Sequence, residues 1–242
     1  MRLMRLGPAI LAIGASVFAI SGQAEAGFVD LITNGGFETG DSTGWTIASL
    51  GNTGSFFIDT PGTPTPLTGL PTQGNPQGGS FYAVSDEVGP GTRVLLQPFT
   101  VPQGLVPVQV SFDMIVNNRG EGPFIDQQAR VDILVGGASP FSTAPADILR
   151  NFYLGVDPGG LAANPHPFTS YDFNITGLLP PGATTYQLRF MEVDSVFFLN
   201  QGVDNVSFLT TVVPEPSSLV LGCAGSICIA IGVARRKWQG RA

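Results

Sequence analysis

Runs in which apolar and polar residues alternate fill the central part of the chain and limit its fold more than any other feature. In "VPVQVSFDMIV" the alternation predicts a core-facing row, Val108, Val110, Phe112 and Met114, and a solvent-facing row, Gln109, Ser111 and Asp113. Similar apolar rows follow: Val131, Ile133 and Val135; Tyr171, Phe173 and Ile175; Tyr186, Leu188 and Phe190; Val206 and Phe208. Gly, Pro and Asn clusters separate these runs, and none keeps a helical period for three turns. The pattern predicts an all-β fold, an antiparallel β-sandwich.

Two stretches without alternation are predicted to be connections. "PGTPTPLTGLPTQGNPQGG", residues 61–79, is rich in proline, glycine and threonine and should form an irregular surface loop. "NNRGEGPFIDQQ", residues 117–128, is a shorter polar connection between two predicted strands, at one end of the sandwich.

The first residues have the features of an export signal. Two arginines precede an almost uncharged apolar run over residues 8–20, and "AEA" then places small residues at Ala24 and Ala26. This small-x-small pattern is the one that signal peptidase reads. Residues 1–26 are therefore predicted to be a signal peptide, followed by an ectodomain over residues 27–212.

A second apolar segment lies near the C-terminus. It spans 217–234, and 18 residues of helix at about 1.5 Å each give roughly 27 Å, close to the hydrocarbon thickness of a bilayer. Three basic residues follow it directly: Arg235, Arg236 and Lys237. Under the positive-inside rule they stay in the cytoplasm and leave the ectodomain outside the inner membrane. The sequence thus predicts one C-terminal transmembrane helix and a basic tail, 235–242.

The charge of the ectodomain narrows its partners. Between the predicted leader and the tail the chain carries five arginines and no lysine against sixteen carboxylates. Such a charge balance repels phosphate backbones, so nucleic-acid binding is not expected, whereas cations and neutral glycans fit. Both cysteines, Cys223 and Cys228, lie in the apolar tail, so a packed core must stabilise the ectodomain without a disulfide.

The residues needed for catalysis are scarce. His166 is the single histidine, it lies between two prolines, and no nucleophile motif accompanies it. Zinc ligands of the usual His and Cys types are equally scarce. A carboxylate pair for glycoside hydrolysis is the remaining option, with Glu192 and Asp194 as the first candidates. We expect a non-enzyme, with a glycan-active hydrolase as the alternative.

Two motifs at opposite ends of the ectodomain carry a resemblance. "LITNGGFETGDSTGWT", residues 31–46, and "GVDNVSFL", residues 202–209, together resemble jelly-roll carbohydrate-binding modules with a galactose-binding-like fold. The resemblance implies a structural calcium that joins the terminal strands, with Glu38 and Asp204 as carboxylate ligands and Gly36 supplying a carbonyl. These are only part of the six to eight oxygens that calcium requires. The alternative is a simple turn with Trp45 in the core and Asp204 in solvent.

Sugar binding is a separate question from this resemblance, because one fold hosts many functions. Glycan sites use exposed aromatic side chains. The aromatic residues of this ectodomain mostly fall within strand patterns, so each is expected to pack in the core.

The tail from 213 to 242 closely resembles a PEP-CTERM sorting signal. It combines the motif residues Pro214, Glu215 and Pro216 with an apolar helix and a terminal basic cluster, in that order. The resemblance implies that an exosortase recognises the motif and removes the helix, in a Gram-negative bacterium that makes exopolysaccharide. A permanent single-span anchor is the alternative.

Together these features predict an exported, inner-membrane-anchored precursor that is released to the cell surface or the extracellular matrix. Its expected function is non-catalytic interaction with exopolysaccharide. A purely structural envelope protein is the second alternative to this function.

Overall fold

The computed structural model describes residues 27–72, 78–118, 127–155, 165–180, 182, 184–195 and 199–212. The predicted signal peptide with its cleavage site and the predicted sorting tail with its motif, helix and basic cluster lie outside these residues. Within them, no helix is long and apolar enough to cross a membrane. The export and sorting signals therefore stay predictions.

The described part of the chain contains eleven strands and no helix. They are β1 (Phe28–Asp30), β2 (Thr46–Gly51), β3 (Gly54–Asp59), β4 (Tyr82–Glu87), β5 (Gly91–Thr100), β6 (Leu105–Asn118), β7 (Gln128–Val135), β8 (Ile148–Gly155), β9 (Thr169–Asn174), β10 (Thr185–Asp194) and β11 (Leu199–Val212).

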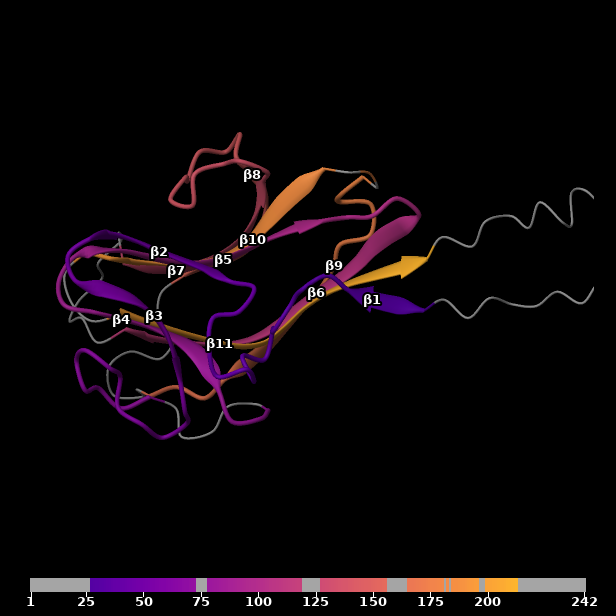
Figure 1. Cartoon of the computed structure of the whole chain (residues 1–242). Coiled ribbons are helices and arrows are strands. Elements are labelled where there is room, and N and C mark those ends of the chain that lie inside the picture. Colours follow the sequence, from indigo (N-terminus) through magenta and orange to yellow (C-terminus); the bar gives the residue numbers. More distant parts are fainter. Residues whose placement is uncertain are drawn as a thin grey trace, which may run out of the picture. The chain divides into compact units, whose positions relative to one another are not determined.

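The strands form two antiparallel sheets that lie one above the other in Figure 1. The six-stranded sheet has the order β3-β4-β11-β6-β9, and β1 also pairs with β11. The five-stranded sheet has the order β2-β5-β10-β7-β8. The prediction of an all-β fold with antiparallel sheets is thus confirmed.

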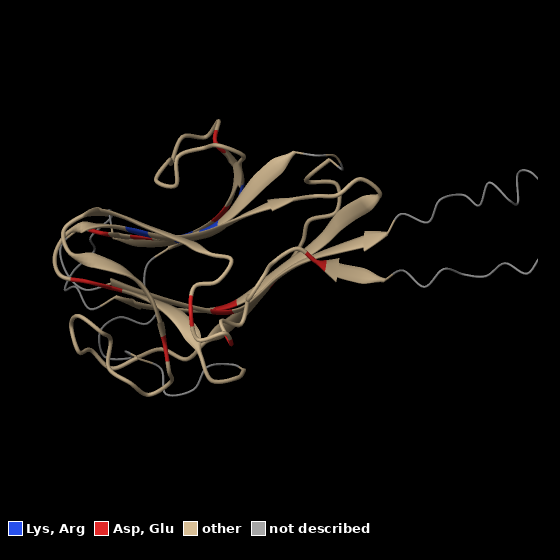
Figure 2. Cartoon of the chain, in the orientation of Figure 1, with Lys and Arg blue, Asp and Glu red and all other residues tan. Residues whose placement is uncertain are grey.

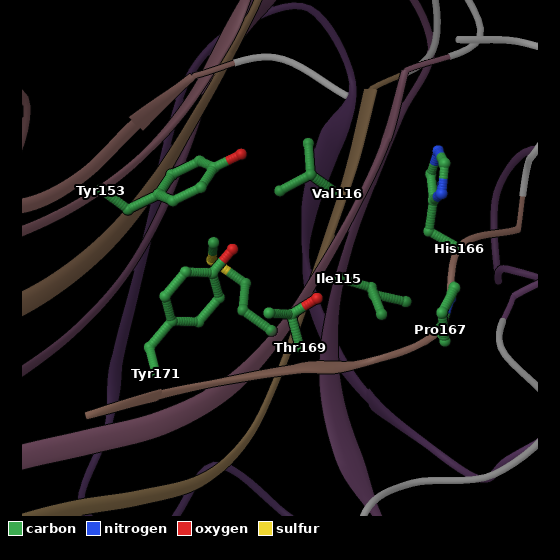
Figure 3. Close-up of a pocket in the computed structure, with 8 residues that line it drawn as sticks. Ile115, Val116, Tyr153, His166, Pro167, Thr169 and Tyr171 are labelled. Atoms are coloured by element: carbon green, nitrogen blue, oxygen red, sulfur yellow. The ribbon is translucent and has the colours of Figure 1, made fainter. Parts of the chain in front are cut away.

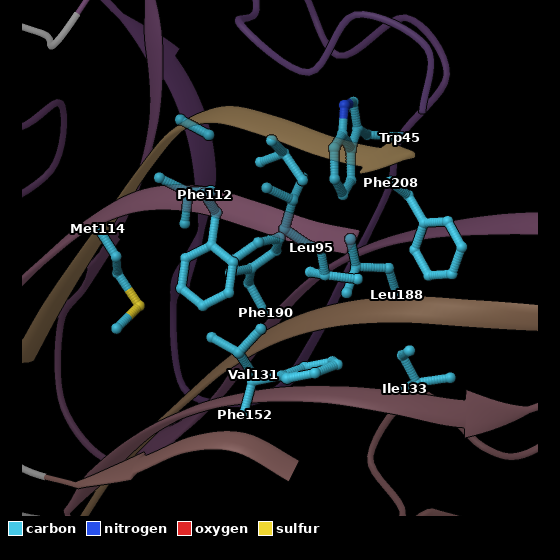
Figure 4. Packing of buried hydrophobic residues seen from close by; sticks show 14 of the residues in the cluster. Trp45, Leu95, Phe112, Met114, Val131, Ile133, Phe152, Leu188, Phe190 and Phe208 are labelled. Atoms are coloured by element: carbon cyan, nitrogen blue, oxygen red, sulfur yellow. The ribbon is translucent and has the colours of Figure 1, made fainter. Parts of the chain in front are cut away.

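The core lies between the two sheets and follows the predicted rows closely (Figure 4). Phe112 of β6 meets Phe190 of β10 edge to face, with ring centroids 5.3 Å apart. Phe99 of β5 and Phe208 of β11 also meet across the sandwich, with their rings tilted by 42° and their centroids 4.4 Å apart. Aromatic pairs of this kind stabilise a fold beyond the area that they bury.

Val108, in the predicted core-facing row of β6, is only half-buried, as are Val135, Tyr171 and Phe173 in the other predicted rows. The register of β6 against β11 shifts between Leu209 and Thr210, whose partners are Gln109 and Pro107, so Val108 has no register partner on β11. An extra residue of this kind is a β-bulge, and it interrupts the alternation of faces. Sequence alternation alone does not reveal where a bulge lies.

The predicted solvent-facing row of β6 also differs, because Asp113 is buried. The outer face of this sheet holds a second apolar cluster, Tyr82, Val84, Ile115 and Phe168. Part of the predicted loop is fastened to this sheet by Asp86 of β4, whose carboxylate accepts hydrogen bonds from the amides of Leu67 (2.6 Å) and Thr68 (2.9 Å). Residues 61–72 are irregular, as predicted, with one isolated bridge.

The outer face of the five-stranded sheet is tied to the connection 136–147. The guanidinium of Arg189 on β10 donates to the carbonyls of Pro140 (2.8 Å) and Ser142 (2.7 Å) and to the carboxylate of Asp132 on β7 (2.5 Å). Arg189 and Asp132 are both fully buried. The ion pair therefore orients the guanidinium, and its bonds to the two carbonyls hold the connection against the sheet.

Candidate functional site

The charged residues are divided unequally between the sheets (Figure 2). Among the described residues, all four arginines lie on the five-stranded sheet: Arg93, Arg130, Arg150 and Arg189. The charged residues on the strands of the six-stranded sheet are all acidic: Asp30, Asp59, Asp86, Glu87, Asp113, Asp172 and Asp204. The six-stranded sheet should therefore attract cations.

Much of this acidity is inside the molecule. Seven of the thirteen carboxylates in the described residues are buried, against three of the four arginines. A buried carboxylate needs hydrogen-bond donors, a cation or a proton, because burial penalises its charged form. The acidic residues are therefore expected to form sites inside the fold that bind a cation or a proton, and to give the surface a negative charge.

The two end motifs of the ectodomain meet on the six-stranded sheet. β1 pairs with the end of β11, and the Gly35 carbonyl accepts a hydrogen bond of 2.9 Å from the amide of Val206. A β-carbon on Gly35 would lie 1.9 Å from the Val206 carbonyl oxygen, so only glycine fits there. On β11 this contact coincides with a register shift between Asp204 and Ser207, where Asn205 has a φ of 49°.

The structure brings Gly36, Glu38 and Asp204 close together. A β-carbon on Gly36 would lie 3.8 Å from Glu38 Cγ and 3.9 Å from Asp204 Oδ1. Asp204 is fully buried, which contradicts the alternative that it lies in solvent. Trp45 is buried, as that alternative expected, and its indole donates to the Asn34 carbonyl at 3.1 Å.

Hydrogen bonds already occupy part of this oxygen cluster. The Glu38 carboxylate accepts from the amides of Ser80 (2.9 and 3.0 Å) and Phe81 (3.1 Å), and it leaves no room for a side chain at Gly79. These contacts fasten the start of β4 to the N-terminal motif.

Asp204 is less completely satisfied than Glu38. Its Oδ1 accepts from the Asn205 amide at 2.8 Å, while Oδ2 has no hydrogen-bond partner within the described part of the chain. Burial, together with the nearby carboxylates of Asp113 and Glu38, raises the pKa of Asp204 to about 7, although the amides of Asn205 and Gly78 lower it.

The cluster fits a metal only in part. The unpartnered Oδ2 of Asp204 and the excess of carboxylates favour a cation. However, within the described ranges no group of three or more His, Cys, Asp or Glu side chains is arranged to hold a metal ion. A cation there would need backbone carbonyls and water as further ligands, as calcium commonly accepts.

A second candidate site is a cavity that the sequence did not indicate (Figure 3). It has a volume of about 100 Å³, and its lining comes from β6, β8, β9 and the segment before β9: Met114, Ile115, Val116, Tyr153, His166, Pro167, Thr169 and Tyr171. Both tyrosines were predicted to pack in the core, yet each is only half-buried. Their rings meet at 76° with centroids 5.6 Å apart.

The topology explains why these tyrosines are accessible. β8 and β9 are the last strands of their sheets, so no further strand in the described part of the chain pairs with their outer edges. Tyr171 stacks on Phe112 of the core at 5.1 Å, which fixes its ring from behind. Figure 3 shows Tyr153 and Tyr171 on one side of the cavity and His166 on the other. The His166 amide donates to Asn117 Oδ1 at 2.8 Å, which fixes the position of its backbone.

The carboxylates that were candidates for glycoside hydrolysis lie elsewhere. Glu192 and Asp194 point between the sheets and are fully or almost fully buried. A polysaccharide has no access to them in this conformation, and neither belongs to the lining of the cavity.

No protein-family model and no curated protein matches this sequence. Several solved structures are similar in fold. The carbohydrate-binding module TmCBM61, solved with β-1,4-galactotriose, is 13% identical, with a TM-score of 0.45 over 74% of this chain and 97% of that chain. The cyclase Fisc from Fischerella sp. TAU is 16% identical, with a TM-score of 0.47 over 77% and 100%.

The active domain of tailspike protein 4 of bacteriophage CBA120 is 14% identical, with a TM-score of 0.43. The match spans 74% of this chain and 21% of that chain. Similarities at these identities and TM-scores assign neither a ligand nor an activity to this protein.

Proposed function

We propose that this protein is an exported, non-catalytic cell-surface or matrix protein whose sandwich, a jelly roll, binds a glycan at the cavity beside Tyr153 and Tyr171. The observation that carries the proposal is this cavity. Half-buried aromatic rings there offer apolar faces, and the side chains of Thr169 and His166 offer hydrogen-bonding groups. Sugar rings present the same combination of apolar C–H faces and hydroxyls.

Size and charge limit the ligand. The cavity is smaller than the about 300–1,000 Å³ that is usual for drug-sized ligands, so it suits one ring or one chain end of a glycan. The chain has a net charge of −7, which disfavours uronate-rich or sulfated polymers. A neutral exopolysaccharide is the expected partner.

Affinity electrophoresis of the full chain in mild detergent tests this function. A gel containing a neutral polysaccharide should retard the protein, and an uncharged gel without it should not. Tyr153→Ala should lose most of the retardation, because it removes one aromatic wall of the cavity. Phe28→Ala changes a residue of β1 that is 66% exposed and does not line the cavity, so it is the matched control and should keep the retardation. Equal retardation of both variants would refute the site.

The same samples separate binding from hydrolysis. A binding protein should release no reducing sugar during prolonged incubation with the retarding polysaccharide. Release of sugar that Glu192→Gln abolishes would favour the hydrolase instead. Neither retardation nor release from any of a panel of neutral glycans would leave the purely structural alternative as the better description.

We also propose that the tail is a PEP-CTERM sorting signal and that the inner membrane holds the precursor until an exosortase acts. The support is the order of motif, apolar segment and basic cluster in the sequence. Intact-mass analysis of the protein from its native host tests this. Chains that begin near Gly27 and end around the motif support processing, whereas chains that extend to Ala242 in the membrane fraction would show a permanent anchor.

A structural calcium at Gly36, Glu38 and Asp204 is a further part of the proposal. The convergence of these residues and the unpartnered Asp204 Oδ2 support it. When bound, the cation would neutralise Asp204 and join the N-terminal motif to β11. Its role would be structural, because the three residues do not line the cavity.

A further inference from the structure

Two glutamates from opposite sheets meet inside the sandwich. Glu87 is the last residue of β4 in the six-stranded sheet, and Glu192 continues the inward-facing row of β10 in the five-stranded sheet. Both are completely buried, and the two carboxyl groups lie close enough to share a hydrogen bond when one of them carries a proton. They are thus a direct polar connection between the two layers.

The carboxyl oxygens of this pair have few hydrogen-bond donors around them. Glu87 Oε1 accepts from the amide of Leu199 on β11 at 3.0 Å. As carboxylates, Glu87 Oε2 and both oxygens of Glu192 accept no well-formed hydrogen bond from a described residue, and the Ser85 hydroxyl beside Glu192 is a neutral donor that leaves the second carboxylate charge in place. Two buried carboxylates in contact cannot both remain ionised at low cost. A proton on Glu192, donated to Glu87, supplies the missing hydrogen.

The charged neighbours do not replace this proton. Arg93 lies opposite Glu192 in the register of β5 and β10, and its charge lowers the pKa of Glu87 by less than burial raises it. Its two terminal nitrogens donate to the carbonyls of Leu50 (2.9 Å), Asn52 (3.0 Å) and Thr92 (3.1 Å). Asp194 adds further negative charge beside both glutamates. The other described neighbours from adjoining strands are uncharged: Gly54, Ser85, Ala129 and Leu199.

We propose that Glu87 and Glu192 form a proton-dependent latch, which holds this end of the sandwich closed while the pair retains a proton and loosens it when that proton is lost in alkaline solution. A shared proton makes the contact attractive, and its loss leaves two negative charges without solvent. Since the glutamates belong to different sheets, their repulsion acts directly to separate the layers.

The acid–base properties of the pair agree with this mechanism. Burial raises the pKa of Glu87 from 4.5 to about 7, and burial together with the charge of Glu87 raises the pKa of Glu192 well above 4.5. In the unfolded chain both groups ionise near pH 4.5. Unfolding therefore releases protons above that pH, so the stability of the fold must fall as pH rises.

Thermal unfolding of the full chain in detergent between pH 5 and pH 9 tests the latch. The Tm of the wild type should fall by about 10 °C across this range. Glu192→Gln should make the profile less steep, because its amide donates to Glu87 at every pH, and the raised pKa of Asp204 accounts for a slope that remains. Glu87→Gln should do the same and serves if the first variant does not fold. Asp172→Asn, an exposed carboxylate on β9, is the control and should keep the wild-type slope.

Hydrogen exchange tests whether this end of the sandwich opens. Protection of the Leu199 amide, corrected for the intrinsic pH dependence of exchange, should fall at alkaline pH, while that of the Phe190 amide in the core persists. Glu192→Gln should retain the Leu199 protection. If both glutamine variants keep the wild-type Tm slope, or if Leu199 stays protected at pH 9, the latch does not exist.

Discussion

The amide of Val206 donates a hydrogen bond of 2.9 Å to the carbonyl of Gly35, which joins two segments that lie far apart in the sequence. The same approach places the Val206 carbonyl where a side chain at residue 35 would begin. This contact fixes the N-terminal motif on the bulged part of β11, next to Glu38 and Asp204. It therefore sets the geometry of the proposed cation site.

Adjacent glycines give a sharp test of this contact. Gly35→Ala should destabilise the fold by roughly 3 kcal/mol or more, because its β-carbon would overlap the backbone of β11. Gly36→Ala should cost less than about 1 kcal/mol, because the nearest atom to its β-carbon is 3.8 Å away. Urea denaturation of both variants measures the difference. Equal losses would show that the approach of Gly35 to β11 is not as close as described.

Calcium removal tests the proposed cation. A chelator should lower the Tm of the wild-type protein, since a ligand that binds only the folded state stabilises it by mass action. Asp204→Asn should remove this response, whereas Asp172→Asn should keep it. Differential scanning calorimetry with and without added calcium makes the comparison. An unchanged wild-type Tm, together with no metal in elemental analysis, would exclude the site.

The buried ion pair on the outer face of the five-stranded sheet should be costly to break. Asp132→Asn leaves Arg189 without its carboxylate in a fully buried position and should destabilise the protein by about 3–5 kcal/mol. Arg150→Met changes an exposed arginine of the neighbouring strand and should change stability by less than about 0.5 kcal/mol. Chemical denaturation measures both. If Asp132→Asn leaves the free energy of unfolding unchanged, the hydrogen bonds from Arg189 to the two carbonyls are enough to stabilise its buried charge.

The loop over residues 61–72 should depend on one carboxylate. Asp86→Ala removes the acceptor for the amides of Leu67 and Thr68 and for the Thr68 hydroxyl (2.6 Å). Limited proteolysis should then cut this loop faster, because its backbone can reach an extended conformation more often. Asp59→Ala, which affects the Thr60 amide and the Thr63 hydroxyl at the other end of the loop, is the comparison. Equal cleavage of wild type and Asp86→Ala would show that other contacts hold the loop.

The period of two in the sequence determined much of the secondary structure and the core of this protein. It identified β6, β7, β9, β10 and β11 and most of their buried residues, because a strand that buries one face has apolar residues at every second position. It did not identify β1, β2, β3, β4, β5 or β8. β4 is buried on both faces and so lacks a clear alternation, and the exposed residues of β2 and β8 follow no regular pattern.

The candidate sites, unlike the secondary structure, depend on contacts between residues that lie far apart in the sequence. The sequence named Gly36, Glu38 and Asp204, and the pairing of β1 with β11 brings them together. Only the tertiary structure decided that Glu87 and Glu192 meet, since one belongs to each sheet. It also placed Tyr153 and Tyr171 beside a cavity, because edge position and sheet stacking, rather than residue type, determine which aromatic side chains remain accessible.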